Sequence, residues 1–210
     1  MSENAATPGG PQPGAFDARF DMRILESVRG QSVLVCVTGG IAAYKTCIIV
    51  SRLSQAGANV HVAMTEAATH FVTPLTFQAL SANPVYTSAW EHIESKDPQH
   101  VSLAREASLV VVAPCTMDCM AKLAHGFTDD IVTLIISAVD RAKTPVLLAP
   151  AMNAAMWGQN STQRNLATLR QDGFVTVGPG TGWQACRTVG DGRMSEPEEI
   201  LRVIAESVRR

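Results

Sequence analysis

The sequence predicts a single-domain α/β fold built on a doubly wound parallel sheet. From Ser32 onward, short runs rich in valine and leucine alternate with longer segments of helical periodicity. This alternation is typical of βαβ units, whose parallel sheet is covered by helices on both faces. The chain has 210 residues, of which 46% are hydrophobic, and this is enough apolar material for one sizeable core.

The first strand is expected at Ser32–Val37, because this run is apolar on both faces, as a buried parallel strand requires. A glycine turn follows it and leads into a helix over residues 41–55, which Gly57 ends as a C-terminal cap. The other strands are expected at Asn59–Met64, 109–113, 145–149 and 174–177. The other helices are expected at 116–124, 129–139, 162–171 and 196–208.

Residues 1–29 are expected to form a disordered tail ahead of a folded domain at residues 30–210. The tail contains the stretch PGGPQPG at residues 8–14, a composition that does not build a packed core. It has neither the basic start nor the apolar run of a signal peptide. No apolar run approaches the roughly 20 residues that cross a bilayer, so we expect a protein with no membrane partner.

Charge and cysteine content narrow the classes of partner. The formal net charge of −2 leaves no basic surplus to neutralise the backbone of a nucleic acid. The five cysteines include no CxxC pair of the kind that binds zinc or performs thiol exchange. They are interpreted as reduced thiols of a cytoplasmic protein with no metal site. A small-molecule substrate is the expected partner.

In a doubly wound sheet, ligands bind beyond the carboxyl ends of the strands, so the residues that follow each strand are the informative ones. The first strand is followed by Thr38-Gly39-Gly40-Ile41-Ala42, at the start of a helix. Free backbone N–H groups and the helix dipole favour an anion there. A phosphate site and an ordinary tight turn both remain open, because glycine serves either. Lys45, within this helix, is expected to be solvated.

Thr65 follows the second strand at the same edge of the sheet. Its hydroxyl is suited to donate to a phosphate, and it is equally suited to cap the next helix by accepting from the N–H of Ala68. Both interpretations stay open.

Four further segments lie after strands or in loops: HVSL at residues 100–103, APCTMDC at 113–119, APAMNAAMW at 149–157 and QACRTVGDGRM at 184–194. Together with the glycine turn, and in this order, they resemble the homo-oligomeric flavin-containing cysteine decarboxylases of the phosphopantothenoylcysteine decarboxylase type. The resemblance covers about residues 31–210. It implies a Rossmann-like flavoprotein.

The resemblance implies an FMN cofactor with its phosphate on the glycine turn and near Thr65, and with its ring between the subunits of a homotrimer, which in some relatives assembles further into a dodecamer. The implied activity is decarboxylation of 4′-phosphopantothenoylcysteine to 4′-phosphopantetheine in coenzyme A synthesis. Flavin is the usual two-electron acceptor for oxidising the thiol end of such a substrate before CO₂ leaves. The implied cofactor-binding residues are Gly39, Gly40, Ile41, Thr65, Phe71, Met117, Asp118, Cys119, Met120 and Ala151.

Three residues match the catalytic positions of these enzymes. His100 matches a catalytic histidine that exchanges a proton near neutral pH. Asn153 matches the asparagine that holds the substrate carboxylate. Cys186, in a glycine-rich segment expected to be a mobile flap, matches the proton donor of the final reduction. The resemblance further implies that Asn153, Met156, Ala185 and Arg193 bind the substrate.

Two positions differ from the family pattern Pro-Ala-Ser-Ala-Asn-Thr and Ala-Cys-Gly: Asp118 replaces an asparagine, and Arg187 replaces the glycine. An ionised Asp118 repels a carboxylate substrate unless a cation such as Arg187 lies near it. Two alternatives therefore stay open, a flavoprotein that decarboxylates a peptide C-terminal cysteine and a non-catalytic FMN-binding regulatory protein. Cys115 and Cys119 are expected to pack in the core and not to bind metal.

Overall fold

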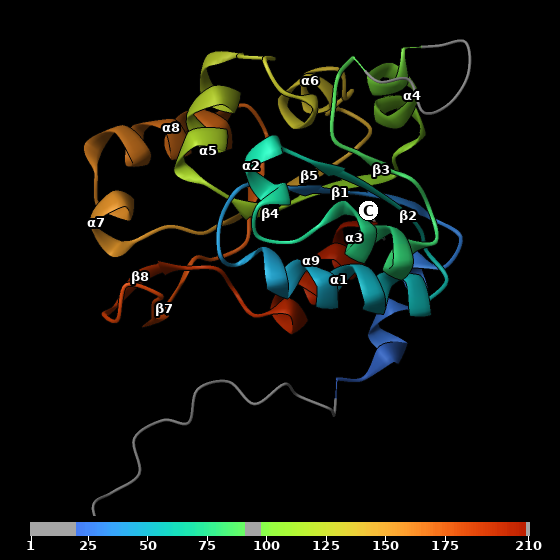
Figure 1. Cartoon of the computed structure of the whole chain (residues 1–210), viewed down its shortest axis with the longest axis horizontal. Coiled ribbons are helices and arrows are strands. Elements are labelled where there is room, and N and C mark those ends of the chain that lie inside the picture. The colour runs from blue at the N-terminus through green and yellow to red at the C-terminus, as the bar shows by residue number, and fades with distance from the viewer. Residues whose placement is uncertain (1–19, 91–97, 209–210) are drawn as a thin grey trace, which may run out of the picture.

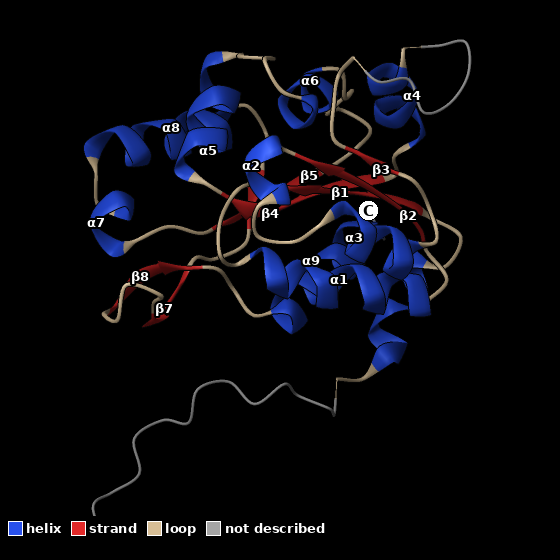
Figure 2. Cartoon of the chain, viewed as in Figure 1, coloured by secondary structure: helices blue, strands red, loops and turns tan. Residues whose placement is uncertain are grey.

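A six-stranded parallel sheet forms the centre of the computed structural model, which describes residues 20–90 and 98–208 (Figures 1 and 2). The strand order is β3-β2-β1-β4-β5-β6, the order of a doubly wound sheet whose connections reverse between β1 and β4. The predicted fold class is confirmed. None of the described helices is long and apolar enough to span a bilayer.

The sheet strands are β1 (Ser32–Val37), β2 (Asn59–Met64), β3 (Val85–Tyr86), β4 (Leu109–Cys115), β5 (Val146–Pro150) and β6 (Val175–Thr176). The helices are η1 (Met22–Val28), α1 (Ala43–Gln55), α2 (Glu66–Thr69), α3 (Pro74–Ser81), α4 (Gln99–Glu106), α5 (Met117–His125), α6 (Ile131–Ser137), α7 (Ala154–Trp157), α8 (Asn160–Gln171) and α9 (Pro197–Val208). An antiparallel hairpin, β7 (Gly180–Trp183) with β8 (Val189–Arg193), lies apart from the main sheet.

Each face of the sheet has its own core, because successive side chains of a strand point to opposite faces. In β1, Val33, Val35 and Val37 belong to the cluster covered by α1, α3, α9 and η1. Leu34 and Cys36 belong to the cluster covered by α4, α5, α6 and α8. The wholly apolar run of β1 therefore reflects burial on both sides (Figure 1).

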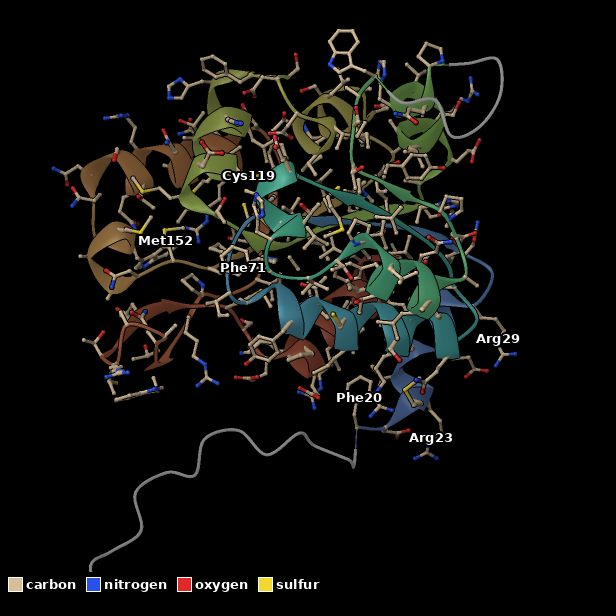
Figure 3. The ribbon with its side chains drawn as sticks, viewed as in Figure 1. Phe20, Arg23, Arg29, Phe71, Cys119 and Met152 are labelled. Carbon is tan, nitrogen blue, oxygen red and sulfur yellow. The ribbon has the colours of Figure 1, made fainter. Side chains whose placement is uncertain are left out.

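The folded part extends further toward the N-terminus than expected. Residues Met22–Val28 form a 3₁₀-helix that packs against α9, with Leu25 and Val28 fully buried. Phe20 is also buried at the base of this helix (Figure 3). The expected tail at residues 1–29 thus includes an ordered segment from Phe20 onward, and residues 1–19 lie outside the described residues.

The predicted long elements agree with the structure to within a few residues, whereas several short ones were not predicted. Helices α2, α3, α4 and α7 have between four and eight residues, too few for a helical period to stand out in the sequence. The hairpin lies in the glycine-rich segment that was expected to be a mobile flap. Cross-strand pairs such as Thr181 with Asp191 and Trp183 with Val189 make it an antiparallel ladder, with a shift of register between Gly180 and Thr181.

Candidate active site

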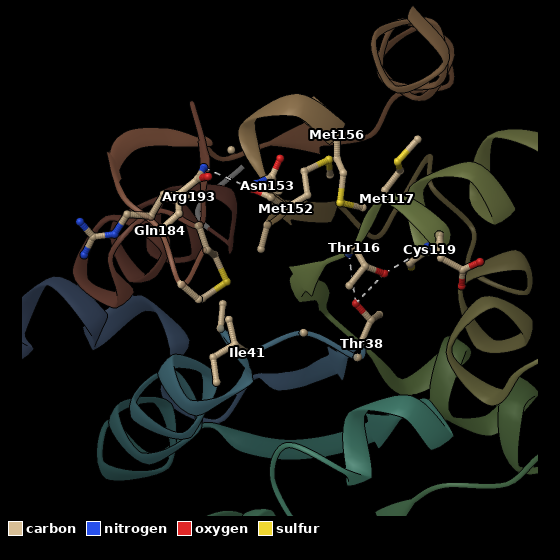
Figure 4. Close-up of a pocket in the computed structure, with 18 of the residues that line it drawn as sticks. Thr38, Ile41, Thr116, Met117, Cys119, Met152, Asn153, Met156, Gln184 and Arg193 are labelled. Atoms are coloured by element: carbon tan, nitrogen blue, oxygen red, sulfur yellow. Dashed lines mark hydrogen bonds between the residues drawn. The ribbon is translucent and has the colours of Figure 1, made fainter. Parts of the chain in front are cut away.

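A cavity of about 1570 Å³ opens at the carboxyl ends of β1 and β4, where the strand order reverses. It exceeds the roughly 300–1,000 Å³ usual for a small-ligand site, so it has room for more than one small ligand. The glycine turn and the start of α5 form one side of it. Asn153, the start of α7 and the β7–β8 hairpin form the other (Figure 4).

Two threonines join the turns that follow β1 and β4. The hydroxyl of Thr38 donates to the carbonyl of Pro114 at 2.7 Å and accepts from the backbone N–H of Thr116 at 3.1 Å. Thr116 in turn caps α5 by accepting from the N–H of Cys119 at 3.3 Å (Figure 4). These bonds hold the two helix N-termini in a fixed relation at the floor of the cavity. Sequence analysis assigned no role to either threonine.

The glycine turn presents unused backbone donors to the cavity. Within the described part of the chain, the N–H groups of Gly40, Ile41 and Ala42 donate to no other group. They lie at the N-terminus of α1, where the helix dipole favours an anion. Gly39 is required for a different reason, because a Cβ atom there would collide with Ala67 of α2. The turn is therefore both a tightly packed junction and a ready anion site.

Thr65 fulfils the capping role that was one of its two interpretations. Its side-chain oxygen accepts from the N–H of Ala68 at 3.3 Å, which makes it the N-cap of α2. The residue also lines the cavity, and its hydroxyl hydrogen is not used by the cap. The capping role and a role as donor to a ligand are thus compatible.

Asn153 and Cys186 come together although 33 residues separate them. The Asn153 side-chain oxygen caps α7 by accepting from the N–H of Ala155 at 2.8 Å, which turns the amide nitrogen outward. That nitrogen lies 3.1 Å from the sulfur of Cys186. The hydroxyl of Thr188 lies 3.0 Å from the same sulfur. Together these contacts lower the pKa of the Cys186 thiol, with Thr188 as the largest cause.

Gln184 fastens the hairpin to the loop before α7. This buried side chain accepts from the backbone N–H of Ala154 at 3.1 Å and donates to the carbonyl of Asp191 at 2.7 Å. The backbone N–H of Met152 completes the junction by donating to the carbonyl of Gly192 at 2.9 Å. The segment that carries Cys186 is therefore anchored at both ends.

Lys45 is buried, contrary to the expectation that it is solvated. Its Nζ donates to the side chain of Glu196 at 3.0 Å and to the carbonyl of Met194 at 3.3 Å. Arg193 binds the same Glu196 oxygen at 2.6 Å. Burial lowers the pKa of Lys45, and the Glu196 carboxylate opposes this. The cluster ties the end of the β7–β8 hairpin to the helix that follows the glycine turn.

Asp118 pairs with Lys122, and within the described residues no ion pair joins it to Arg187. The two side chains of α5 are one turn apart, with Nζ 3.5 Å from the carboxylate. Lys122 also pairs with Asp129 and Asp130, each at 3.1 Å. Partial burial tends to lower the pKa of Lys122, but hydrogen bonds to Asp130 and Asp129 outweigh it and raise the pKa. All four side chains line one end of the cavity.

Most of the residues expected to form the site line this one cavity: Gly39, Gly40, Ile41, Thr65, Met117, Asp118, Cys119, Ala151, Asn153, Met156, Ala185, Cys186 and Arg193. Three do not. Met120 is fully buried in the core, Phe71 is half exposed after α2, and His100 lies on α4. Sequence analysis also missed Gln184, whose role depends on contacts that no local pattern reveals.

The cysteines of α5 and β4 are core residues, as expected. Cys36, Cys115 and Cys119 are all buried in the cluster under α5. A hydrogen bond with the Cys115 thiol, together with burial, raises the pKa of Cys119. Among the described residues, no group of three or more histidine, cysteine or acidic side chains is placed to hold a metal ion.

Known proteins share both the sequence and the fold. A family model described as Flavoprotein matches residues 22–209. The coenzyme A biosynthesis bifunctional protein CoaBC of Bacillus subtilis is 46% identical over 176 residues, which are 84% of this chain and 43% of that protein. The protein of the same name from Vibrio cholerae is 44% identical over 84% of this chain and 44% of its own length. The chain thus spans less than half the length of these relatives.

Solved structures match nearly end to end. A cysteine-to-serine mutant of PPC decarboxylase, complexed with pantothenoylaminoethenethiol, is 29% identical with a TM-score of 0.79 and covers 87% of this chain and 100% of its own. The FMN binding protein AtHal3 is 31% identical with a TM-score of 0.73, covering 84% and 95%. The FMN-dependent cysteine decarboxylase SpaF is 28% identical with a TM-score of 0.70, covering 87% and 99%. With a family model that matches most of its length, this chain belongs to the flavoprotein family.

Proposed function

We propose that this protein is an FMN-dependent carboxy-lyase that converts 4′-phosphopantothenoylcysteine to 4′-phosphopantetheine, a step of coenzyme A synthesis. The observation that carries the proposal is the meeting of the Asn153 amide and the Cys186 thiol in one cavity with the glycine turn. This places a carboxylate donor, a proton donor and an anion site within reach of a single substrate–cofactor pair.

The residues present fit FMN. The free N–H groups of Gly40, Ile41 and Ala42, with Thr65 and the packed Gly39, would hold its phosphate. The cavity walls near Met117, Asp118, Cys119 and Ala151 would hold the remainder of the cofactor. When bound, the cofactor supplies the two-electron oxidation of the substrate thiol end and the later return of those electrons.

The side chains of this chain then bind the substrate and give it a proton. The outward amide nitrogen of Asn153 donates to the substrate carboxylate without adding charge, and Met156, Ala185 and Arg193 contact the remainder of the substrate. Cys186, beside that amide, gives its proton to the carbon that has lost CO₂.

The names of the relatives support this chemistry. The curated relatives are named for coenzyme A biosynthesis, and the aligned structure with the TM-score of 0.79 is named a PPC decarboxylase. That structure pairs a cysteine-to-serine replacement with an ethenethiol, the species expected when a cysteine proton donor is missing. SpaF is named an FMN-dependent cysteine decarboxylase without further detail of its substrate, so the alternative that this chain decarboxylates a peptide C-terminal cysteine stays open.

His100 is proposed to act from a second copy of the chain. It lies on α4 and does not line the cavity of its own chain within the described residues. Two large apolar side chains that line the cavity, Ile41 and Tyr44, are exposed and suited to be covered by another copy, and Phe71 and Leu75 are exposed as well. A cytoplasmic homotrimer, alone or assembled into a dodecamer, accounts for both features.

The test begins with the purified protein and its visible spectrum. Anaerobic incubation with 4′-phosphopantothenoylcysteine, followed by CO₂ release and product mass, should give a yellow protein that forms 4′-phosphopantetheine. A yellow protein that turns over only a peptide with a C-terminal cysteine would redirect the substrate assignment. A yellow protein inert to both would contradict the enzymatic proposal and favour a regulatory FMN-binding role.

A further inference from the structure

The sulfur of Cys186 contacts polar groups from two different elements. The amide of Asn153, at the start of α7, lies 3.1 Å from it, and the hydroxyl of Thr188 lies 3.0 Å from it. The side-chain oxygen of Gln184 lies 3.5 Å away on the acceptor side. An exposed thiol thus has an amide donor from the start of α7, a hydroxyl from its own loop that can donate or accept, and an acceptor.

A tight loop brings Thr188 back to Cys186. The N–H of Gln184 donates to the carbonyl of Thr188 at 2.8 Å, and the N–H of Arg187 donates to the carbonyl of Gln184 at 2.9 Å. Arg187 has a φ of 65°, the left-handed conformation that reverses the chain between the two residues. The position of the Thr188 hydroxyl is therefore fixed by the backbone of the loop.

We propose that Thr188 is a positioning residue for Cys186, whose sulfur it holds beside the Asn153 amide and whose thiolate it stabilises once the proton has been given up. This inference rests on the proposed function and assigns a role to a residue that contacts the acid and not the substrate. Thr188 lies in the loop of the hairpin, whereas Asn153 lies before α7. The Thr188 hydroxyl therefore gives the sulfur a second donor from a different part of the chain.

The proton balance of the step explains why two donors are useful. The S–H bond of Cys186 breaks, and its electron pair stays on the sulfur as a thiolate. The proton forms a C–H bond with the electron pair that CO₂ left in the carbon skeleton of the substrate. The thiolate then accepts from the Thr188 hydroxyl and the Asn153 amide, and because Cys186 is exposed, water can return the proton.

The Asn153 amide carries two hydrogens, which allows it to contact the sulfur and a substrate carboxylate at the same time. One hydrogen faces Cys186, and the other is free for a substrate carboxylate, since the amide oxygen is engaged by Ala155. A bound carboxylate places negative charge next to the sulfur and favours the protonated thiol. When neutral CO₂ departs, the negative charge and its electron pair stay on the carbon skeleton of the substrate, which then accepts the proton of the Cys186 thiol.

The charged groups around the sulfur do not supply this stabilisation. On the hairpin side, Asp191 accepts from Thr181 at 2.5 Å, Arg193 is paired with Glu196, and Arg187 is exposed and is not among the causes of the lowered pKa of Cys186. On the other side, α7 contains only Ala154, Ala155, Met156 and Trp157. The lowered pKa of Cys186 has Thr188 as its first cause and Asn153 as a further one.

Alkylation with iodoacetamide, read at the Cys186 peptide by mass spectrometry across a pH series, tests the role without any turnover. Cys186 is the exposed thiol, whereas burial raises the pKa of Cys47 and Cys36. In Thr188→Val the alkylation profile should move to higher pH, and the rate at neutral pH should fall about threefold or more. Thr188→Ser should keep the wild-type profile.

Thr181→Val is the matched control, because this threonine lies on the same hairpin and bonds Asp191 instead of the sulfur. It should leave the Cys186 profile unchanged. An equal shift in Thr181→Val and Thr188→Val would mean general loosening of the hairpin and would overturn the assignment. So would an unchanged profile in Thr188→Val.

Turnover separates this inference from the proposed function. In a single anaerobic turnover of 4′-phosphopantothenoylcysteine, Thr188→Val should lose protonation and not decarboxylation, so a larger share of the product should remain as the unreduced enethiol, with an equal amount of flavin left reduced. If the wild type itself releases no CO₂ while the alkylation profile still shifts, the proposed function fails and the Thr188–Cys186 contact stands. If the wild type releases CO₂ and no enethiol accumulates in Thr188→Val, the role of Thr188 in protonation is wrong.

Discussion

At the scale of single residues, Asn153 combines two tasks in one amide. Its oxygen caps α7, and its nitrogen faces Cys186 and the cavity. The cap decides which end of the amide points outward, so the folding role and the binding role are coupled. An aspartate at this position keeps the capping oxygen and loses the donor, which allows the two tasks to be separated.

We expect Asn153→Asp to fold and to bind FMN normally while kcat/KM for CO₂ release falls by about a hundredfold or more. The lost hydrogen bond to a carboxylate and the added repulsion together account for this loss. Thermal unfolding and the flavin spectrum serve as the folding controls. Activity near the wild-type level would show that the substrate carboxylate binds elsewhere.

At the scale of elements, the glycine turn depends on its fit against α2. A Cβ atom on Gly39 would collide with Ala67, whereas one on Gly40 would only meet Thr116 at 3.5 Å, an ordinary contact. Gly39→Ala should therefore lower the free energy of unfolding by about 1–3 kcal/mol through overpacking. Gly40→Ala should change it much less. Urea unfolding of the two variants measures the difference.

A second substitution, at Ala67, should relieve the collision that a Cβ atom on Gly39 creates. Ala67→Gly removes the atom nearest to the new methyl group, so the double variant Gly39→Ala with Ala67→Gly should recover part of the lost stability. Equal stability of the double variant and Gly39→Ala would mean that the turn is strained by something other than this contact.

Lys45 joins two elements that are far apart in the sequence. Its ammonium group connects α1 to Glu196 and to the carbonyl of Met194, beyond the end of β8. Lys45→Met keeps most of the side-chain volume, removes the donor to the carbonyl of Met194 and leaves Glu196 with Arg193 alone. The free energy of unfolding should fall by about 1–3 kcal/mol, and hydrogen exchange should rise in the β7–β8 hairpin.

Lys143→Met is the matched control for this substitution. Lys143 also pairs with a carboxylate, that of Asp140, but both side chains are largely exposed. Such surface pairs contribute little, so its stability should stay within about 0.5 kcal/mol of the wild type. A similar loss in both lysine variants would mean that the burial of Lys45 does not matter.

The local sequence pattern was sufficient to predict the elements in which buried residues recur at a regular spacing. Strand β1 is apolar on both faces, and its predicted bounds match the structure, as do those of β2. The i, i+4 pair of Asp118 and Lys122 was also visible in the sequence, but Arg187 was considered in its place. The link from Lys45 to Glu196 spans 151 residues, so no local rule anticipates it. For the same reason Gln184 was missed.

At the scale of the whole molecule, the residues expected to form the site do not all line one cavity. Asn153 and Cys186 line it, whereas His100 lies on α4 and does not line it within the described residues. Under the proposed function, a second copy of the chain would supply His100 and would cover the exposed side chains of Ile41 and Tyr44 at the cavity. The sequence predicted His100, Asn153 and Cys186 as site residues, but it did not predict that His100 lies apart from the other two.

This separation predicts that two inactive variants restore each other. His100→Ala and Asn153→Asp should each be inactive alone, yet a trimer that contains both has sites where an intact His100 of one copy faces an intact Asn153 of another. Random assembly of equal amounts should recover about a quarter of the wild-type rate before purification, since each site draws two subunits independently, and about a third in doubly purified protein, because each mixed trimer has one such site in three. Co-expression with two different tags, followed by CO₂ measurement on doubly purified protein, tests this. No recovery in the mixed trimers would place His100 in the same subunit as Asn153, or outside the reaction.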